Sequence, residues 1–583
     1  MTRQLVKRSN PFGAAGAGWT WLALGLCLAG APATAQAPSP SPMAFLSLVE
    51  QAEGRSAARD WAAAASLWEQ VVRINPTEGR FWNSLGMARF MAREFAAAIP
   101  ALQRSFELGH GMVENVAYNV ACAYALLGDK DQAFAWLERA LALRFLDLDH
   151  AQRDPDLASL HGDPRFARLI PAAADVSGMS RKAGWRHDMD VLQWQIDRLA
   201  YAPYRLRPRS WFQQQFAALA ATASRRSDLQ MALELARIMR ELGDGHSGVQ
   251  RGWTPEWAMS LPLQFQAFPE GVFITAAAPV HRDLLGAQLL AFGDHPIAEM
   301  MRRLEATVSR DNDSGWARLT ATYRLRYTAL LHAAGLNSSA DSATLRLRYV
   351  DGRERSVRVP ADMSQPDIWN QRPGPPGWTR MTATGEGASP LYLRDPARNY
   401  WFEHLPQHRS IYWAFNSLRD QGDETLHAFA RRMMRFIEEN RVNRLVIDLR
   451  WNNGGNASLM TPVLASLLRS ERISGRGRLI VLIGPRTFSA AQSAAAMLER
   501  YTNAIFVGEP SGSSPNFVGE EDPFTLPFSQ VVVNVSTLFH QSSLPQDRRT
   551  WIAPLILAPV SFADYRAGRD PAMEAVLAIP IPD

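Results

Sequence analysis

Lysine and cysteine are nearly absent from this chain of 583 residues. The only lysines are Lys7, Lys130 and Lys182, so no lysine amine stands after Lys182 to act as a base. The two cysteines, Cys27 and Cys122, are too few for a cysteine metal site or a disulfide framework. Cys122 lies in the helical pattern YNVACAYALLG, where we expect a small core residue and not a reactive thiol.

Long runs of one charge are absent as well. The formal net charge is +5, and it falls to +2 when the three basic residues near the N-terminus are removed (5 − 3 = 2). Without a run of Lys or Arg, nothing in the sequence indicates nucleic-acid binding. Metal-ligand spacings, phosphate-binding loops and the G-x-S-x-G motif are also missing, so we expect no metal and no cofactor.

The N-terminal segment is typical of a secretory signal peptide. Residues 1–35 combine Arg3, Lys7 and Arg8 with the apolar run WTWLALGLCLAGA and the small residues at 33–35. The apolar run is too short to span a membrane. We therefore expect secretion across the inner membrane, into the periplasm, without a stable membrane span. An uncleaved N-terminal anchor is the alternative.

A short Pro/Ser linker at 36–43 leads into residues 44–175, which carry an internal period. Ala64, Ala98 and Ala133 recur 34 and 35 residues apart in equivalent patterns. Such a period predicts stacked helical hairpins, and it resembles the tetratricopeptide repeat. A stack of this kind binds a peptide or protein partner; the alternative is that it only supports the domain that follows.

The next two regions differ in periodicity. Residues 178–250 have apolar residues three and four apart and predict a helical segment, which ends at Gly243 and Gly245. Residues 251–380 alternate short apolar runs with polar turns and predict a small β-rich region around one helix at 295–308. The stretch LLGAQLLAFGDHPIAEM resembles the end of a PDZ-like module, although the glycine-rich carboxylate loop of that module is not evident.

Residues 400–583 predict a mixed, mostly parallel α/β core, because strands alternate with helices through most of this region. The predicted strands are 410–415, 445–449, 479–483, 505–507 and 531–536, and the predicted helices are 425–440, 460–468 and 489–501. The whole chain is therefore expected to be a multidomain α/β protein that begins with an all-α repeat stack and a helical segment.

Two strand ends in this core carry candidate chemistry. VIDLRWNNGGN (446–456) ends in a glycine turn with bare backbone N–H groups. LIVLIGPRTFSAAQSAAAMLER (479–500) places Ser489 at a helix N-terminus, whose free N–H groups favour developing negative charge. A serine beside an anion-stabilising turn is the arrangement of acyl transfer. The alternative is that Ser489 only caps its helix and that the glycines only form a tight turn.

Five segments resemble, in order, the tail-specific or C-terminal processing protease family of serine peptidases. They are ELGDGHSGV, VIDLRWNNGG, GPRTFSAA, FVGEPSG and YRAGRDPAMEAVL, and the resemblance extends from about residue 180 to the C-terminus. It implies that 400–583 is a serine protease core with Ser489 as nucleophile. Family members commonly use a lysine base after the GE motif, but 508–516 contains none. The chain is therefore more similar to the tricorn-like branch, which uses a histidine.

This resemblance assigns roles to further residues. His246 in ELGDGHSGV corresponds to the histidine base. Asp547 is the best match to the acid that orients the base, with Asp244 as the alternative. The backbone N–H groups of Gly455 and Ala490 would bind the oxyanion.

Three more residues are expected to support the site. Asp448 and Arg450 should form a salt bridge that fixes the glycine turn, and Gln492 should line the site or pack beside it. We predict a secreted serine peptidase that hydrolyses peptide or protein substrates through an acyl-enzyme. The alternatives are a catalytically silent binding protein on the same fold, which the retinoid-binding relatives of this family illustrate, and a scaffold that acts through its repeats.

Overall fold

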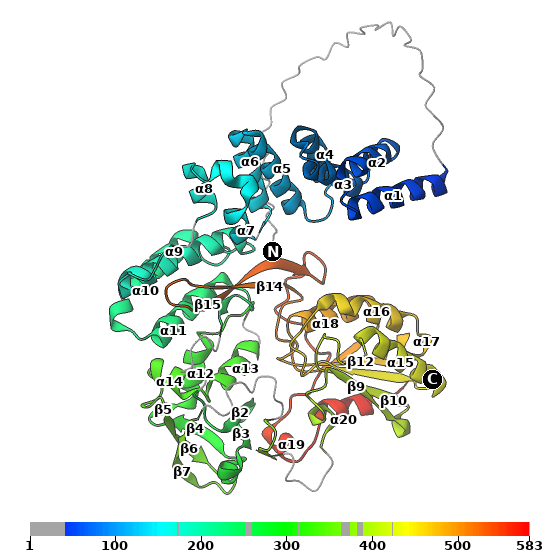
Figure 1. Ribbon diagram of the computed structural model, residues 1–583. Coiled ribbons are helices and arrows are strands. Elements are labelled where there is room, and N and C mark those ends of the chain that lie inside the picture. The colour runs from blue at the N-terminus through cyan, green and yellow to red at the C-terminus, as the bar shows by residue number, and fades with distance from the viewer. Residues whose placement is uncertain are drawn as a thin grey trace, which may run out of the picture. The chain divides into compact units, whose positions relative to one another are not determined.

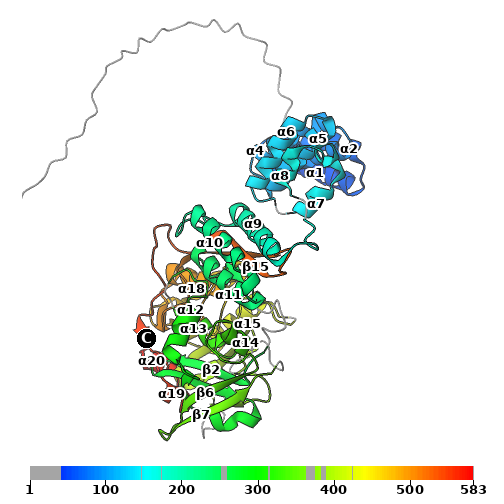
Figure 2. The same cartoon turned by 90° about the vertical axis from the view of Figure 1, so that its left-hand side faces the viewer.

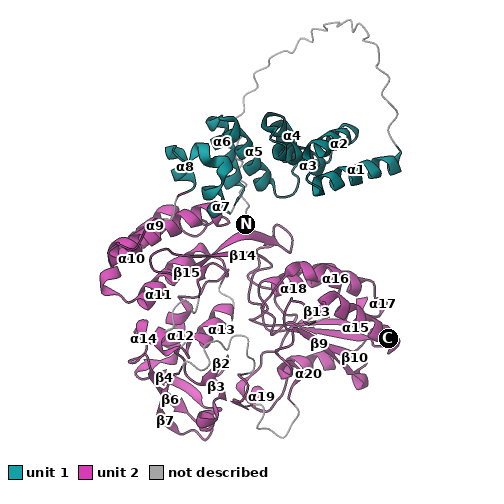
Figure 3. Ribbon diagram, viewed as in Figure 1, with its two compact units in different colours: residues 1–170 teal, residues 171–583 magenta. Residues whose placement is uncertain are grey.

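The computed structural model describes residues 41–581 except 146, 172–173, 251–258, 313–314, 363–373, 382–388 and 423. The predicted signal peptide and most of the linker after it lie outside the described residues. Within the described part of the chain, no helix is long and apolar enough to cross a membrane. The chain divides into two compact units, residues 1–170 and 171–583 (Figure 3).

Unit 1 is a stack of helices, so the predicted all-α region is confirmed (Figure 1). Ala64, Ala98 and Ala133 are completely buried, as expected of small residues where helices approach each other closely. The helices are α1 (Pro42–Ala57), α2 (Trp61–Ile74), α3 (Gly79–Met91), α4 (Phe95–Glu107), α5 (Val113–Leu127), α6 (Lys130–Ala142), α7 (Leu148–Arg153) and α8 (Pro164–Leu169).

Unit 2 begins with the predicted helical segment, α9 (Arg181–Leu199), α10 (Arg209–Ala221) and α11 (Asp228–Met239). Apolar side chains of all three helices share one core with Val533 and Val535 of a distant strand. A 3-10 turn follows α11, and the chain leaves it at Gly243 with a φ of 77°. Glycine adopts this left-handed conformation without strain, so the helical turn ends at the glycine predicted to stop it.

The β-rich region forms a seven-stranded sheet in the order β2-β3-β4-β6-β7, with β5 beside β4 and β8 beside β3. Its strands are β2 (Leu263–Phe268), β3 (Gly271–Ala277), β4 (Gln288–Phe292), β5 (His295–Pro296), β6 (Ser342–Arg348), β7 (Glu354–Pro360) and β8 (Thr379–Arg380). The likeness of this region to a PDZ module remains a prediction.

The prediction of a single helix in this region is wrong. Three helices, α12 (Ile297–Glu305), α13 (Gly315–Arg324) and α14 (Thr328–Ala333), lie along one side of the sheet (Figure 2). The buried residues of α13 include Ala317, Thr320 and Ala321. Small and hydroxyl-bearing side chains of this kind give a weak hydrophobic period, which explains why α13 is hard to find in the sequence.

The core contains a six-stranded sheet in the order β16-β13-β12-β11-β10-β9, parallel except for β9. This confirms the mixed, mostly parallel core. Side chains alternate between its faces: Ile447 faces one apolar cluster, and Val446 faces the other.

The strands are β9 (Tyr400–Leu405), β10 (Ser410–Phe415), β11 (Arg444–Asp448), β12 (Leu479–Ile483), β13 (Ile505–Gly508) and β16 (Ile556–Leu557). The helices are α15 (Leu426–Glu439), α16 (Met460–Leu468), α17 (Glu471–Ser474), α18 (Ala490–Tyr501), α19 (Phe562–Arg566) and α20 (Pro571–Ala578).

A separate three-stranded sheet has the order β1-β15-β14. The strands β14 (Asn516–Thr525) and β15 (Val532–Gln541) form a long hairpin, of which only 531–536 was predicted as strand. The two-residue strand β1 (Gly248–Val249) pairs with β15, so that Gly248 lies opposite Asn534. This pairing brings the end of the helical segment beside the long hairpin.

Candidate active site

Ser489 occupies the junction between β12 and α18. Its backbone has φ 54° and ψ −129°, a conformation that a residue with a side chain rarely adopts. Strain of this kind is kept where a side chain must be presented in a fixed direction. The Ser489 side chain makes no capping hydrogen bond to the described helix α18, so helix capping does not account for this serine.

His246 lies directly against Ser489. Its Nε2 is 2.9 Å from the Ser489 Oγ, although 243 positions separate the two residues in sequence. The imidazole stacks on Phe488, with ring centroids 4.8 Å apart, and on Phe517, at 5.7 Å. Trp316 stacks in turn on Phe488 at 3.8 Å. These rings fix the plane of the imidazole.

The loop that carries His246 is held by Asp244. Its carboxylate accepts hydrogen bonds from the backbone N–H groups of His246 (3.0 Å) and Ser247 (2.5 Å) and from the Ser536 hydroxyl (2.7 Å). Ser536 belongs to β15, and its N–H donates back to Ser247 Oγ at 2.9 Å. Asp244 therefore ties the histidine loop to the long hairpin.

Asp311 holds the same loop from another side and was not predicted from the sequence. Its carboxylate accepts a hydrogen bond from the Gly245 N–H at 2.8 Å and another from the Ser513 hydroxyl. Burial raises the pKa of the Asp311 carboxyl, and the nearby imidazole of His246 opposes that shift. A single acid in a polar loop gives no periodic signal, so only the folded chain identifies this contact.

The glycine turn lies on the other side of Ser489. A Cβ at Gly454 would be 2.8 Å from the Ser489 Cβ and 3.0 Å from the Ala490 nitrogen, so only glycine fits there. The Gly454 N–H already donates to Asn452 Oδ1 at 2.9 Å. Gly455 and Ala490 line the same cleft as Ser489. The Ala490 N–H is the first of α18 and has no acceptor within the helix.

Behind this turn, Arg450 joins two buried carboxylates. It binds Asp448 at 2.6 Å and Asp570 at 2.8 Å, and the Tyr412 hydroxyl donates to Asp448 at 2.6 Å. Burial opposes the charge on Asp570, but Arg450 lowers the pKa of this carboxyl below its ordinary value. The ion pair that we expected between Asp448 and Arg450 is present, and Asp570 was missed although it lies in the motif YRAGRDPAMEAVL.

Asp547 has other partners than the base, and Gln492 takes the packed position that is one of its two expected places. The Asp547 carboxylate accepts a hydrogen bond from the Ser543 hydroxyl at 2.7 Å and pairs with Arg549 at 2.8 Å. Among the described residues, His246 is not one of its partners. Hydrogen bonds from Arg549, two positions away in sequence, stabilise the carboxylate of Asp547 and hold its pKa well below the ordinary value. Gln492 is completely buried and packs inside the core instead of lining the cleft.

The site opens into a cleft of about 980 Å³. Walls of the cleft come from the loop after α11, the segment between α12 and α13, the glycine turn, the start of α18 and the hairpin β14–β15. Residues that line it include His246, Trp316, Gly455, Ser489 and Phe517. This volume accommodates several residues of an extended peptide.

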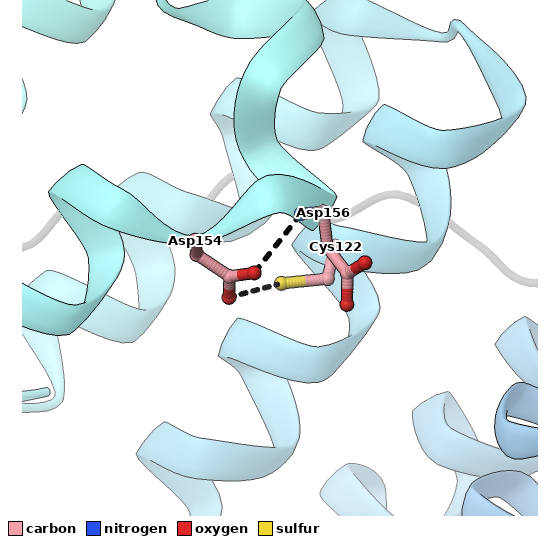
Figure 4. A group of neighbouring side chains, drawn as sticks. All are labelled: Cys122, Asp154 and Asp156. Atoms are coloured by element: carbon pink, nitrogen blue, oxygen red, sulfur yellow. Dashed lines mark hydrogen bonds between the residues drawn. The ribbon is translucent and has the colours of Figure 1, made fainter.

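A second cluster of polar groups lies in unit 1 (Figure 4). Cys122, Asp154 and Asp156 place ligand-type atoms within 4.8 Å of one another. Asp154 accepts hydrogen bonds from the Asp156 N–H at 2.9 Å, the Cys122 thiol at 3.8 Å and the Tyr118 hydroxyl at 2.6 Å. Burial raises the pKa of the Cys122 thiol, which disfavours the thiolate that binds metals. We infer no metal site here.

Comparison with known proteins identifies the family of the core. Residues 412–522 match peptidase family S41. This stretch is an S41 peptidase domain. The match confirms the resemblance seen in the sequence motifs, and the chain is a serine-type peptidase. Ser489 and the glycine turn lie inside the S41 domain, whereas His246 lies outside the matched residues.

Several solved structures are similar to this chain at low sequence identity. Mature CPAF complexed with lactacystin has 14% identity and a TM-score of 0.47, and the match covers 68% of this chain and 97% of that one. The photosystem II D1 C-terminal processing protease has 12% identity and a TM-score of 0.34, covering 68% and 98%. MamA has 21% identity and a TM-score of 0.20, covering 22% and 74%. Comparison with curated protein sequences finds no match.

The buried ion pairs behind the S41 glycine turn predict a large loss of stability in Arg450→Met. Removal of the guanidinium leaves two buried carboxylates without their partner, which costs about 3–5 kcal/mol. Denaturant unfolding at pH 7 measures this loss. The exposed Arg431→Met on α15 is the control, and we expect it to change stability by less than about 0.5 kcal/mol.

The same substitution has a predictable pH dependence. Because Arg450 lowers the pKa of Asp570 in the folded state, its contribution is present above about pH 3.9, the ordinary carboxyl value, and is lost as the pH falls through the folded pKa. The difference between Arg450→Met and the wild type should therefore shrink as the pH is lowered from about 4 through the folded pKa of Asp570. A difference that stays constant with pH would contradict this account of the ion pairs.

Proposed function

We propose that Ser489 is the nucleophile of this peptidase and His246 its general base. The contact of 2.9 Å between Nε2 and Oγ is the observation that supports the proposal most directly. His246 takes the proton of Ser489 as Oγ attacks the substrate carbonyl carbon, and the protonated imidazole gives that proton to the leaving amine. Water then attacks the acyl-enzyme with the same histidine as base, and Ser489 is released.

The negative charge on the carbonyl oxygen needs hydrogen-bond donors during both attacks. We propose the backbone N–H groups of Gly455 and Ala490 for this role, because both residues line the cleft beside Ser489. The Gly454 N–H is occupied by Asn452 and is not available. Loss of one such donor costs about 2.7–4 kcal/mol of transition-state stabilisation in other serine peptidases.

We propose that aromatic packing and the hydrogen bonds of its loop orient His246, and that Asp547 does not. The stacking on Phe488 and Phe517 fixes the plane of the ring. The hydrogen bonds of Asp244 and Asp311 fix the backbone of the loop that carries it. Nδ1 of His246 is buried without a hydrogen-bond partner among the described residues, so in this geometry the ring is held by packing.

We also propose that the enzyme is secreted into the periplasm. The basic residues, apolar run and small residues of 1–35 support secretion into the periplasm. The N-terminal sequence of the exported chain would show cleavage near Ala35 if this is right and an intact Met1 if it is wrong.

Labelling with a fluorophosphonate probe tests the proposed chemistry. The probe should react with the wild type and not with Ser489→Ala, because only an activated serine forms the adduct. His246→Ala should label at least about a hundredfold more slowly, since loss of a general base typically costs that factor or more. His427→Ala, an exposed histidine on α15, is the matched control and should label at the wild-type rate. Equal labelling of wild type and Ser489→Ala would refute the assignment of the nucleophile.

The pH profile distinguishes a histidine base from other bases. A histidine must be neutral to accept the proton, and histidine side chains ordinarily titrate near pH 6.5. The kcat/KM of the wild type should therefore have an acid limb, on which activity falls as the base is protonated, and a plateau at higher pH. Lys182→Ala should show the same profile, whereas the residual activity of His246→Ala should not. An unchanged acid limb in His246→Ala would show that another group is the base.

The helical repeats are proposed to bind a protein, either the substrate or a partner. They form a compact unit separate from residues 171–583, which suits a recruitment module. A chain that begins at residue 171 should therefore retain activity on a short peptide and lose activity on a protein substrate whose hydrolysis the full chain supports. Equal losses on both substrates would mean that the repeats support the fold of the peptidase and recruit nothing.

A further inference from the structure

Arg419 lies beside the glycine turn of the active site. It belongs to the segment between β10 and α15 and lines the same cleft as Ser489. A Cβ at Gly455 would be 2.3 Å from the Leu418 carbonyl oxygen and 3.1 Å from the Arg419 Cγ. The aliphatic part of Arg419 therefore packs against the turn that presents the proposed oxyanion donor.

The backbone on either side of Arg419 is fixed to this turn. The Leu418 N–H donates to the Gly454 carbonyl at 3.0 Å, and the Asn456 N–H donates to the Leu418 carbonyl at 2.8 Å. The side-chain amide of Asn399 donates to the Arg419 carbonyl at 3.0 Å. These bonds hold Arg419 at a constant position relative to the site, although its side chain is exposed.

No acid among the described residues forms an ion pair with Arg419. Two described acids near it in sequence are engaged elsewhere: the Asp420 carboxylate accepts from the Leu426 N–H at 2.8 Å, and Glu424 pairs with Arg432 at 2.8 Å. An arginine guanidinium carries five N–H donors in a planar fork that matches a carboxylate. Arg419 thus presents this fork to the cleft.

Charges of the opposite sign lie in another part of the cleft. Glu520 and Glu521 of β14 line it, and the preceding Gly519 lies against the imidazole, because its Cβ would be 3.3 Å from His246 Cε1. Because the proposed role of His246 is to give its proton to the leaving amine, we place the two glutamates on the side of the departing segment. Arg419 lies towards the carbonyl oxygen. The cleft therefore favours a substrate with a negative group near Arg419.

We propose that Arg419 selects substrates that carry a carboxylate within about two residues of the scissile bond. The distance follows from the reach of an arginine side chain and the roughly 3.3–3.6 Å that each residue of an extended peptide spans. An Asp or Glu side chain can supply the carboxylate, and so can a free C-terminus. The proposal rests on the proposed function of Ser489 and His246.

Cleavage profiles of peptide libraries test this selection. The full-length wild type, Arg419→Glu and Arg431→Glu are incubated with one library with free C-termini and a second library with amidated C-termini, and the cut sites are identified by mass spectrometry. Arg431→Glu makes the same change in charge on exposed α15, outside the cleft. Fluorophosphonate labelling of each variant shows whether Ser489 is still activated.

The wild type and Arg431→Glu should favour carboxylate-bearing sites over neutral ones by about tenfold or more, as expected for a charge-assisted hydrogen bond. Arg419→Glu should lose this preference or reverse it towards Lys and Arg while Ser489 is still labelled. Enrichment of Asp and Glu in both libraries identifies a side-chain carboxylate. Cuts close to the end that disappear in the amidated library identify the C-terminus.

Identical profiles of labelled wild type and Arg419→Glu would overturn the role of Arg419 and leave the proposed function intact. Absence of both cleavage and labelling in the wild type would instead overturn the proposed function, and the selection by Arg419 with it. Loss of labelling in Arg419→Glu alone would show that the reversed charge disturbs the site. Arg419→Gln, which keeps size and polarity, then repeats the profile without the reversed charge: loss of the carboxylate preference in this variant supports the proposal, and an unchanged preference refutes it.

Discussion

The candidate active site depends on the pairing of β1 with β15. This pairing is only two residues long, with Gly248 opposite Asn534, and alone it would be weak. The carboxylate of Asp244 strengthens it by binding the N–H groups of the histidine loop and the Ser536 hydroxyl of β15. These contacts hold His246, at the end of the helical segment, beside Ser489, which lies 243 positions further along the chain. Without these contacts, the loop of His246 would lose its attachment to β15.

The serine side of the site is organised differently. Ser489 and the glycine turn both follow strands of one sheet, so the sheet itself places them side by side. The buried Arg450 with Asp448 and Asp570 then fixes the turn from behind, because none of these charges can leave its partners without a large desolvation cost. Rigid strand ends and a packed histidine loop together suit a site whose hydrogen-bond donors must be in place before the charge develops.

Local sequence predicts the parts of this structure that are determined locally. The strands β10 and β12 have the predicted bounds, because continuous apolar runs with turn residues at both ends leave little choice of position. The helix α13 was missed because small and polar residues form much of its buried side. The hairpin of β14 and β15 was found only in part, since charged and polar residues interrupt the alternation in β14.

The same distinction holds for the candidate site. Ser489, His246, Gly455 and Ala490 were all named from motifs, and the structure brings them to one cleft. The contribution of Asp311 could not be read from the sequence, because it depends on a contact between loops 66 positions apart. The motif match assigned Asp547 to the histidine base, but in the structure its carboxylate forms an ion pair with Arg549, two positions away. Motifs identify residue types suited to a reaction, whereas long-range packing decides which of them meet.

A crystal structure of the fluorophosphonate adduct would test the account most directly. The account predicts phosphorus bonded to Ser489 Oγ, with one phosphonyl oxygen within hydrogen-bond distance of both the Gly455 and Ala490 nitrogens. His246 Nε2 should remain within hydrogen-bond distance of Ser489 Oγ, the atom that displaces fluoride from phosphorus. An adduct whose phosphonyl oxygen points away from the glycine turn, or a histidine loop displaced from Ser489, would contradict it.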